Sequence, residues 1–270
     1  MGATAIPLNP SSTRSHMALL AIYWKETKYE FWKYLRLPLY CLLTIFFPVM
    51  FYVLFGLLMN RDGHMGGTSV CAYLIASYGT YGVMGAALYA NGVGVATERG
   101  LGWLQVKRAS PMPPSAYFAA KFAVSMIFSA ASVLTLLTLG TLFGGVHFAM
   151  ATAVQLVLTL VVGAIPFCAM GLVIGCFAGP NSAAAMVNMI YIPLSFASGV
   201  FFPIEKLPKF VQSLAPVLPP YHLAQLALGL VGAAKTGPCW PHWQVLIGCT
   251  LICLGVAWLG FQRDQGKMYG

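Results

Sequence analysis

Few residues of this sequence could take part in polar chemistry, and many of the charged ones lie in one stretch, Glu98–Lys121. Apolar runs long enough to cross a bilayer flank this stretch, so we expect all of it to remain in water. Its excess of Lys and Arg predicts a cytoplasmic position. Its middle, Leu101–Arg108, can form a short amphipathic helix that Pro111, Pro113 and Pro114 then end. Between two membrane helices, such a helix is either a rigid lever or a solvated turn whose charges only set the topology.

A second set of polar side chains falls inside the apolar runs. They recur at helical spacing, so each group shares one face of its helix. In lipid, a polar face either packs against another helix or lines a solute pathway, and both interpretations stay open. These residues are Tyr78, Tyr81 and Tyr89 in an earlier run, and Asn188, Tyr191, Ser195 and Ser198 in a later one.

Neither catalysis nor metal binding is indicated by these side chains. The chain contains no G-x-x-x-x-G-K-[ST] phosphate-binding loop, and its five histidines are dispersed near the expected water interfaces. No Asp, Glu, Lys or Arg lies in the middle of a membrane span from the second to the sixth, whereas a proton- or sodium-coupled carrier needs ionisable groups there. We therefore expect no catalytic residues, no metal ligands and an energy source outside this chain.

The composition is that of a membrane protein. Of 270 residues, 59% are hydrophobic and only 8% are charged, against roughly a quarter charged in soluble domains. The net charge of +9 would suggest nucleic acid as a partner of a soluble chain. Here the charges lie between apolar runs, so contact with lipid headgroups explains them and no nucleic-acid partner is expected.

We predict an all-α integral membrane protein with six transmembrane helices. Eleven of the 15 Lys and Arg residues lie in the amino-terminal segment, in Glu98–Lys121 or in the carboxyl-terminal tail, so both termini are predicted to be cytoplasmic. The predicted multi-pass location is the cell (inner) membrane. The six expected spans are Leu37–Met59, Ser69–Ala96, Ser115–Gly144, Ala151–Phe177, Ser182–Phe202 and Trp243–Phe261.

The chain is expected to divide into a cytoplasmic tail with an interfacial amphipathic helix, residues 1–36, and a single permease domain, residues 37–270. In His16–Arg36, aromatic residues alternate with charged ones, which is typical of a helix that lies along lipid headgroups. The alternative is an ordinary juxtamembrane tail. The aromatic residues of the interfacial helix are Tyr23, Trp24, Phe31 and Trp32. Between the fifth and sixth spans, residues 203–239 are amphipathic and rich in proline, which predicts a re-entrant segment.

The most specific pattern begins in the fifth span. Asn188 is followed by Pro193, Ser198-Gly199 and Pro203, then by Leu207-Pro208 and a proline-rich return to Tyr221. This order and spacing resemble the membrane subunits of ATP-binding-cassette (ABC) exporters of the type-2 permease family.

The charged stretch resembles the same family. Glu98-Arg99, Gly102, Leu104 and Ala109-Ser110-Pro111 match its pattern of E-R, G-T-L-E and A-T-P. Trp103 replaces the usual Thr, and Gln105 replaces the usual Glu, which affects the detail of the partner contact. The resemblance covers nearly the whole chain in order and spacing.

The resemblance implies a transport subunit without enzymatic activity of its own. A second copy of the chain would complete the pathway, and a separate ABC ATPase (nucleotide-binding) subunit would bind ATP and Mg, so no cofactor is expected in this chain. The stretch between the second and third helices would be the coupling helix, seated on the ATPase. The residues assigned to this contact are Glu98, Arg99, Leu101, Gly102, Trp103, Leu104, Gln105, Lys107 and Arg108.

The solute is the least determined part of this interpretation. The apolar and aromatic helix faces favour export of an amphipathic drug-like molecule or a lipid. Export of a polysaccharide or glycolipid is the alternative, because long glycans also slide over aromatic residues. A non-transport membrane assembly protein or receptor with the same fold, and a channel or secondary carrier, are the other classes considered.

Overall fold

The computed structural model describes residues 16–110, 112–233 and 237–266, and these are almost entirely helical. Five helices in this part of the chain are long and apolar enough to cross a membrane. They cover Pro38–Leu58, Val70–Gly100, Pro114–Leu142, Met150–Phe177 and Trp240–Gln262. All five correspond to predicted spans.

The first half of the chain forms one helix across the bundle, two spans and a short connecting helix. π-Helical segments (η1 to η3) interrupt the first two spans. The elements are α1 (His16–Leu35), α2 (Pro38–Cys41), η1 (Leu42–Phe46), α3 (Phe47–Phe51), η2 (Tyr52–Leu58), β1 (His64–Met65), β2 (Thr68–Ser69), α4 (Val70–Leu88), η3 (Tyr89–Val93), α5 (Gly94–Gly100) and α6 (Trp103–Ala109). The antiparallel pair β1–β2 forms the turn between the first two spans.

The second half contains the remaining three long helices. Its elements are α7 (Pro114–Leu142), α8 (Met150–Val162), α9 (Ile165–Phe177), α10 (Ala183–Ala197), η4 (Ile204–Lys206), α11 (Lys209–Leu214), η5 (Ala215–Val217), α12 (Pro219–Leu230) and α13 (Trp240–Gly266). Helix α10 occupies the predicted fifth span, but with 15 residues it is shorter than the roughly 20 that a bilayer core requires. The count of six full spans therefore stays a prediction.

The helix α4 forms the centre of the bundle, and all of its residues are buried. Glycines allow its neighbours to approach closely. A Cβ atom at Gly82 would lie only 3.2 Å from the Thr44 carbonyl oxygen and would also collide with Ser132. At Gly85 it would lie 2.8 Å from the Tyr191 hydroxyl. The first span, α7 and α10 therefore all pack directly against this helix.

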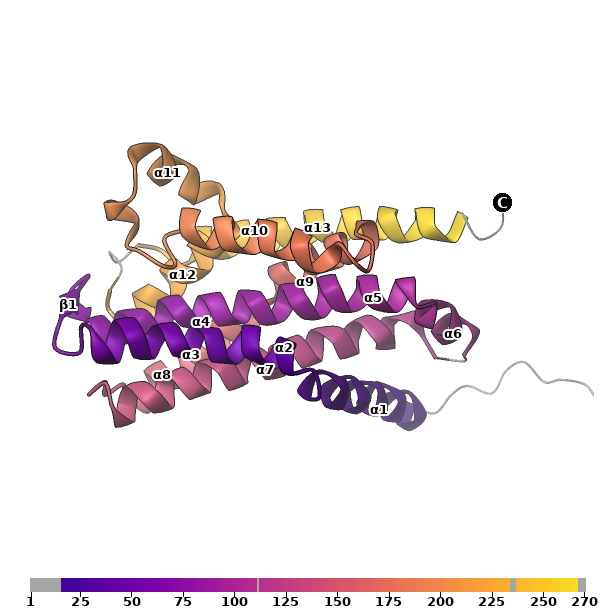
Figure 1. The fold of residues 1–270 in the computed structure, drawn as a ribbon, viewed down its shortest axis with the longest axis horizontal. Helices are drawn as coiled ribbons and strands as arrows, with labels where there is room; N and C mark the ends of the chain where they lie inside the picture. The colour runs from indigo at the N-terminus through magenta and orange to yellow at the C-terminus, as the bar shows by residue number, and fades with distance from the viewer. Residues whose placement is uncertain (1–15, 111, 234–236, 267–270) are drawn as a thin grey trace, which may run out of the picture.

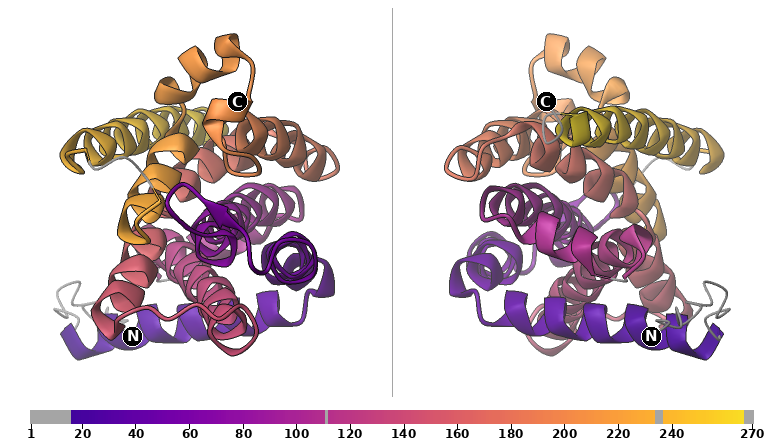
Figure 2. Two further views of the ribbon diagram at one scale, coloured as in Figure 1. Left: turned by 90° about the vertical axis from the view of Figure 1, so that its left-hand side faces the viewer. Right: turned by 90° about the vertical axis from the view of Figure 1, so that its right-hand side faces the viewer.

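The spans run lengthwise, with β1 and α11 at one end of the molecule and α6 at the other (Figure 1). The carboxyl-terminal end of α13 lies at the same end as α6 (Figure 1). Helix α1 lies crosswise to the bundle, as both views along the long axis show (Figure 2). A crosswise helix beside the spans is the arrangement expected of an interfacial helix.

Candidate functional site

The short helix α6 protrudes from the end of the bundle because the chain turns sharply before it. Gly102 adopts the left-handed conformation (φ 76°) that favours glycine, and it precedes the first residue of α6. After the helix, the Ser110 hydroxyl donates a hydrogen bond to the Lys107 carbonyl oxygen (2.7 Å), and Pro114 begins α7. The predicted helix Leu101–Arg108 is thus observed as Trp103–Ala109.

The helix α6 has one anchored face and one open face. The Leu104 side chain is buried in an apolar cluster with Val95, Tyr117, Leu172 and Ala257. By contrast, the exposed fractions of Leu101, Trp103 and Val106 are 69%, 54% and 60%. The sequence assigned Leu104 to the partner contact together with Trp103, but burial commits Leu104 to the core of this chain.

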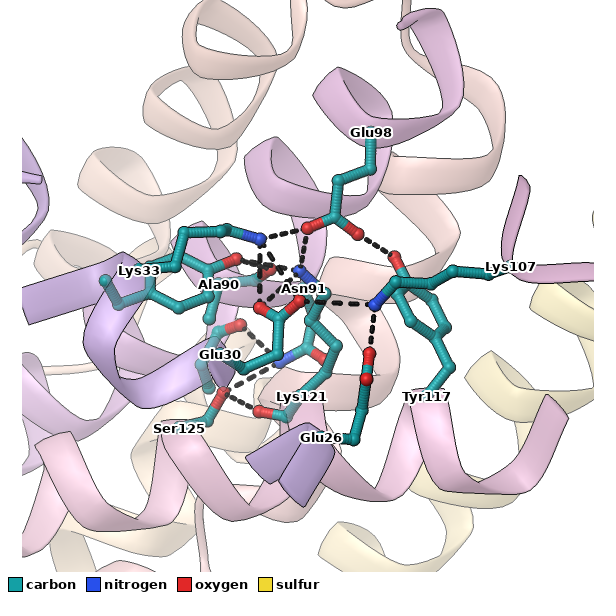
Figure 3. Close-up of polar contacts among 12 residues, drawn as sticks. Glu26, Glu30, Lys33, Ala90, Asn91, Glu98, Lys107, Tyr117, Lys121 and Ser125 are labelled. Atoms are coloured by element: carbon teal, nitrogen blue, oxygen red, sulfur yellow. Dashed lines mark hydrogen bonds and ion pairs between the residues drawn. The ribbon is translucent and has the colours of Figure 1, made fainter. Parts of the chain in front are cut away.

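A network of buried charges lies beneath α6, and Lys121 of α7 is at its centre (Figure 3). The Lys121 side chain is completely buried. Its ammonium group donates to Glu98 (2.6 Å), to Glu30 (3.0 Å) and to the Tyr34 hydroxyl (3.2 Å). An ammonium group has three N–H donors, so each donor has an acceptor and the charge can be buried.

The negative charge of the Glu98 carboxylate in α5 is paired as completely as the positive charge of Lys121. One of its oxygens accepts hydrogen bonds from Lys121 and Lys33. The other accepts a hydrogen bond from the Tyr117 hydroxyl at 2.6 Å. Glu98 therefore joins α5 to α1 and α7 and does not present its carboxylate to a partner on the surface.

The remaining charges of the network come from α1 and α6. Glu26, Glu30 and Lys33 are spaced four and three residues apart, so they share one face of α1. Lys33 pairs with Glu30 at 2.9 Å. Lys107 of α6 pairs with Glu26 and lies 3.6 Å from Glu30. Three carboxylates and three ammonium groups thus alternate across four helices, and we call these six residues with Tyr34 and Tyr117 the ion network.

Hydrogen bonds extend the ion network into the bundle. The Tyr34 hydroxyl donates to the Ala90 carbonyl oxygen at 2.7 Å, and burial raises the pKa of this hydroxyl, so it remains a donor. Asn91 in the π-helical segment η3 donates to the Ser125 hydroxyl (2.9 Å), which donates to the Lys121 carbonyl oxygen (2.9 Å). Helix α1 is therefore hydrogen-bonded directly to the second span.

The expectation that Glu98–Lys121 remains in water is wrong at both ends of the stretch, because Glu98 and Lys121 are buried in the ion network. The sequence carried a signal for this: Tyr117 and Lys121 are four residues apart on one face of α7. For the matching face of α1, the sequence predicts only contact with lipid headgroups. Periodicity identifies such a face but does not identify what it contacts.

The other residues of the predicted coupling stretch divide between internal and open positions. The Arg99 guanidinium donates to the carbonyl oxygens of Cys176 and Ala178 (2.7 Å for Ala178), so it caps the carboxyl end of α9. Gln105 is exposed on α6. The side chain of Arg108 lies outside the described residues. Gly102 forms the turn before α6. Among the described side chains of the predicted coupling stretch, Trp103 is therefore the largest that is exposed.

The aromatic residues of α1 lie on different sides of the helix. Trp24 and Trp32 are exposed. The Phe31 ring packs against Phe128 of α7, with 5.8 Å between centroids. The Tyr23 hydroxyl hydrogen-bonds with the Ser115 hydroxyl at 2.7 Å. Two of the four predicted interfacial residues thus contact the chain itself.

The polar faces of the second span and α10 meet inside this chain. The rings of Tyr81 and Tyr191 stack at 4.5 Å between centroids, and the Tyr191 hydroxyl donates to the Tyr81 carbonyl oxygen at 2.7 Å. The Tyr89 hydroxyl donates to the Asn188 side-chain oxygen. We call Tyr81, Tyr89, Asn188 and Tyr191 the aromatic contact. These contacts are the helix packing that the sequence left open, and a role in the pathway stays a prediction.

The remaining predicted pathway residues, Tyr78, Ser195 and Ser198, are buried. The Ser195 hydroxyl donates to the Tyr191 carbonyl oxygen at 2.7 Å, within α10. Tyr78 lies 6.0 Å, between ring centroids, from both Phe51 and Phe201. Ser198 is buried at the end of α10. These side chains fill the contacts among the first span, α4 and α10.

Two of the histidines expected to be dispersed form a pair instead. The Nδ1 atoms of His222 in α12 and His242 in α13 lie 2.8 Å apart. His222 Nε2 lies 2.8 Å from the Pro216 carbonyl oxygen, which can only accept, so Nε2 donates this hydrogen bond. The pair joins α12 to α13 at the end opposite α6. No group of three potential metal ligands occurs in the described part of the chain.

Comparison with known proteins agrees with the resemblance. The family model described as ABC-2 type transporter matches residues 22–231. The protein named "Putative transport permease YvfS" from Bacillus subtilis (strain 168) is 26% identical over 228 residues. The aligned region covers 84% of this chain and 92% of that protein. The residues matched by the family model include the ion network, α6 and the aromatic contact.

Proposed function

This chain belongs to the ABC-2 type transporter family, and from that premise we propose that it is the membrane subunit of an ATP-driven exporter. Two copies would form the translocation pathway, and a separate ABC ATPase would bind ATP and Mg beneath them. The exported solute would be an amphipathic drug-like molecule or a lipid. The chain would lie in the cell (inner) membrane with both termini in the cytoplasm.

One observation carries the proposal: Leu101, in the turn before α6, and Trp103 and Val106 of α6 are exposed at this end of the bundle. Leu104 and Lys107 anchor the same helix to the bundle and to α1. Apolar side chains grouped on a protruding helix are the usual composition of a protein contact. A groove on an ATPase subunit would bury them.

The ion network connects α6 firmly to other helices of the chain, which coupling to an ATPase requires. Lys107 holds α6 to α1, Leu104 holds it to the bundle, and Glu98 and Lys121 join α5 to α7. A displacement of α6 by the ATPase would therefore act on α1 and on two spans together. ATP-driven closure of the ATPase dimer would move α6 and change access to the pathway.

The exposed faces of α10 and the first span support a dimer. Helix α10 and α2–α3 lie on the same side of α4 (Figures 1 and 2). Both carry exposed apolar side chains, among them Met189 and Ile192 on α10 and Phe46 in the first span. A second copy that met this side would enclose a pathway between the two chains.

Substitution of the main open side chain of α6 tests the proposal. Trp103→Ala should lower solute-stimulated ATP hydrolysis and co-purification of the ATPase, because an aromatic anchor of this kind contributes about 2 kcal/mol or more. The detergent melting temperature should remain that of the wild type, because Trp103 is exposed. Phe210→Ala is the matched control, since Phe210 is an exposed aromatic residue at the opposite end. Normal co-purification of Trp103→Ala would overturn the assignment of α6.

Labelling of single cysteines tests the orientation. Asp62 and Gln262 are exposed near opposite ends of the spans. In a Cys239→Ser background, which removes the exposed native thiol, Asp62→Cys should react with a membrane-impermeant thiol reagent in intact cells. Gln262→Cys should react only after the membrane is permeabilised. The reverse pattern would put α6 outside the cell and exclude contact with a cytoplasmic ATPase.

A further inference from the structure

A cavity of about 720 Å³ lies beside the ion network. Its walls come from α1, the first span, η3, α5 and α6, and Ala184 of α10 closes one side. The volume falls within the roughly 300–1,000 Å³ of pockets that bind small molecules. Two side chains of the proposed ATPase contact, Leu101 and Trp103, also line it.

The cavity is apolar along most of its length. Leu37, Tyr40 and Leu43 line it from the first span, and Tyr89 and Val93 line it from the second. Leu39, which is 64% exposed, stands at its edge, so the cavity opens beside an apolar surface of the first span. An alkyl chain could enter from the membrane along this surface without crossing water.

The other end of the cavity is formed by the ion network. Glu26, Glu30, Lys33, Glu98 and Lys107 all line it. The fully buried Lys121 lies behind them and balances the third carboxylate. The six charges therefore sum to zero and alternate in sign, and Lys33 is the most exposed ammonium group among them.

This charge pattern selects among headgroups. A ligand with a single charge would either stay unpaired in this confined site or take a partner away from one charge of the ion network. Either result leaves one buried charge unpaired, which costs binding free energy. A zwitterion carries both signs, so its anionic group can approach Lys33 or Lys107 while its cationic group approaches Glu26 or Glu30. A neutral headgroup would gain no pairing with these charges.

We propose that this cavity binds a zwitterionic amphiphile about the size of a single-chain phospholipid, with its headgroup in the ion network and its chain along the first span. The inference deepens the proposed function, on which it rests for the role of this ligand as the exported solute. A bound headgroup would compete for the pairs that hold α6 to α1. Occupancy of the cavity would therefore alter the position of the helix proposed to contact the ATPase.

Binding of radiolabelled lysophosphatidylcholine to the purified chain tests the proposal. The chain is kept in a neutral maltoside detergent, and no ATPase is added. We expect saturable binding to the wild type. Unlabelled lysophosphatidylcholine should displace the label. Lysophosphatidic acid and an alkyltrimethylammonium of equal chain length should be weaker competitors by at least about tenfold, the factor that corresponds to ~1.4 kcal/mol of lost pairing.

Two neighbouring residues on α10 supply the matched variants. Ala184 lines the cavity and Ala185 does not, and both are exposed, so both should accept a larger side chain. Ala184→Trp should fill the cavity and abolish saturable binding, and Ala185→Trp should bind as the wild type does. Equal size-exclusion profiles and melting temperatures would show that both variants fold.

Three outcomes would overturn the proposal: no saturable binding to the wild type, equal displacement by all three headgroups, or normal binding to Ala184→Trp. Because the assay contains only this chain, none of these outcomes depends on ATPase coupling. Failure of the Trp103→Ala test would conversely leave a positive binding result intact.

Discussion

The ion network and the aromatic contact both join helices through buried polar groups, but they do so with different chemistry. In the ion network, full charges on α1, α5, α6 and α7 compensate one another, and Lys121 and Glu98 have three partners each. In the aromatic contact, neutral hydroxyl groups of the second span and α10 bond to a backbone carbonyl and to the Asn188 amide, beside stacked rings.

The difference implies different responses to change. A hydrogen bond between neutral groups contributes about 0.5–1.5 kcal/mol net, and the loss of one leaves most of the ring packing in place. A charge that loses its partner in a buried site costs about 3–5 kcal/mol. The ion network therefore makes the end near α6 act as one unit, whereas the aromatic contact can tolerate small displacements of α10.

Removal of the central ammonium group should have the largest effect. Lys121→Met leaves Glu98 and Glu30 buried beside an apolar side chain, so we expect about 3–5 kcal/mol of destabilisation. A much lower melting temperature in detergent would report it. Lys209→Met is the control, because Lys209 is exposed at the opposite end of the bundle.

A second change distinguishes charge from packing in this prediction. Lys121→Met leaves three carboxylates with two ammonium groups. Adding Glu98→Gln removes the carboxylate in excess, so the double variant should melt at a higher temperature than Lys121→Met alone. A single variant Lys121→Met that melts like the wild type would show that the ion network does not hold these helices together.

In the aromatic contact, a smaller loss is expected from Asn188→Leu. The Tyr89 hydroxyl would lose its acceptor, which costs about 1–3 kcal/mol. Tyr89→Phe removes the donor, and a double-mutant cycle with Asn188→Leu measures the pair, because the two losses should not add. If Asn188 instead faces the solute, Asn188→Leu should keep its melting temperature and change which solutes stimulate ATP hydrolysis in the reconstituted complex.

The smallest effect on stability is expected at the edge of the ion network. The side chains of Lys107 and Glu26 are 24% and 16% exposed, so solvent screens their pairing, and Lys107→Met should cost only about 0.2–1 kcal/mol. Glu30 keeps Lys33 and Lys121 as partners. A melting temperature lowered as far as in Lys121→Met would contradict the distinction between the centre and the edge.

The sequence predicted the helices better than their contacts. Five spans were located to within a few residues, because a bilayer requires long uninterrupted apolar runs. The predicted fifth span, Ser182–Phe202, is longer than the helix α10, because the apolar run continues beyond Ala197, where the helix ends. In the candidate site, the sequence identified α6 and its exposed Trp103, but it also assigned the buried Leu104 and Glu98 to a partner surface.

The sequence by itself determined that this protein is a helical membrane protein of its family. The lengths of the apolar runs, the distribution of charge and the spacing of the motifs depend only on the order of residues along the chain. Only the tertiary structure decided which polar groups meet. Lys121 and Glu30 are 91 residues apart, and His222 and His242 are 20 apart. A helical face fixes the direction of a side chain relative to its own helix, whereas its partner depends on how separate helices pack. The ion network, its cavity and the internal packing of the aromatic contact all follow from that packing.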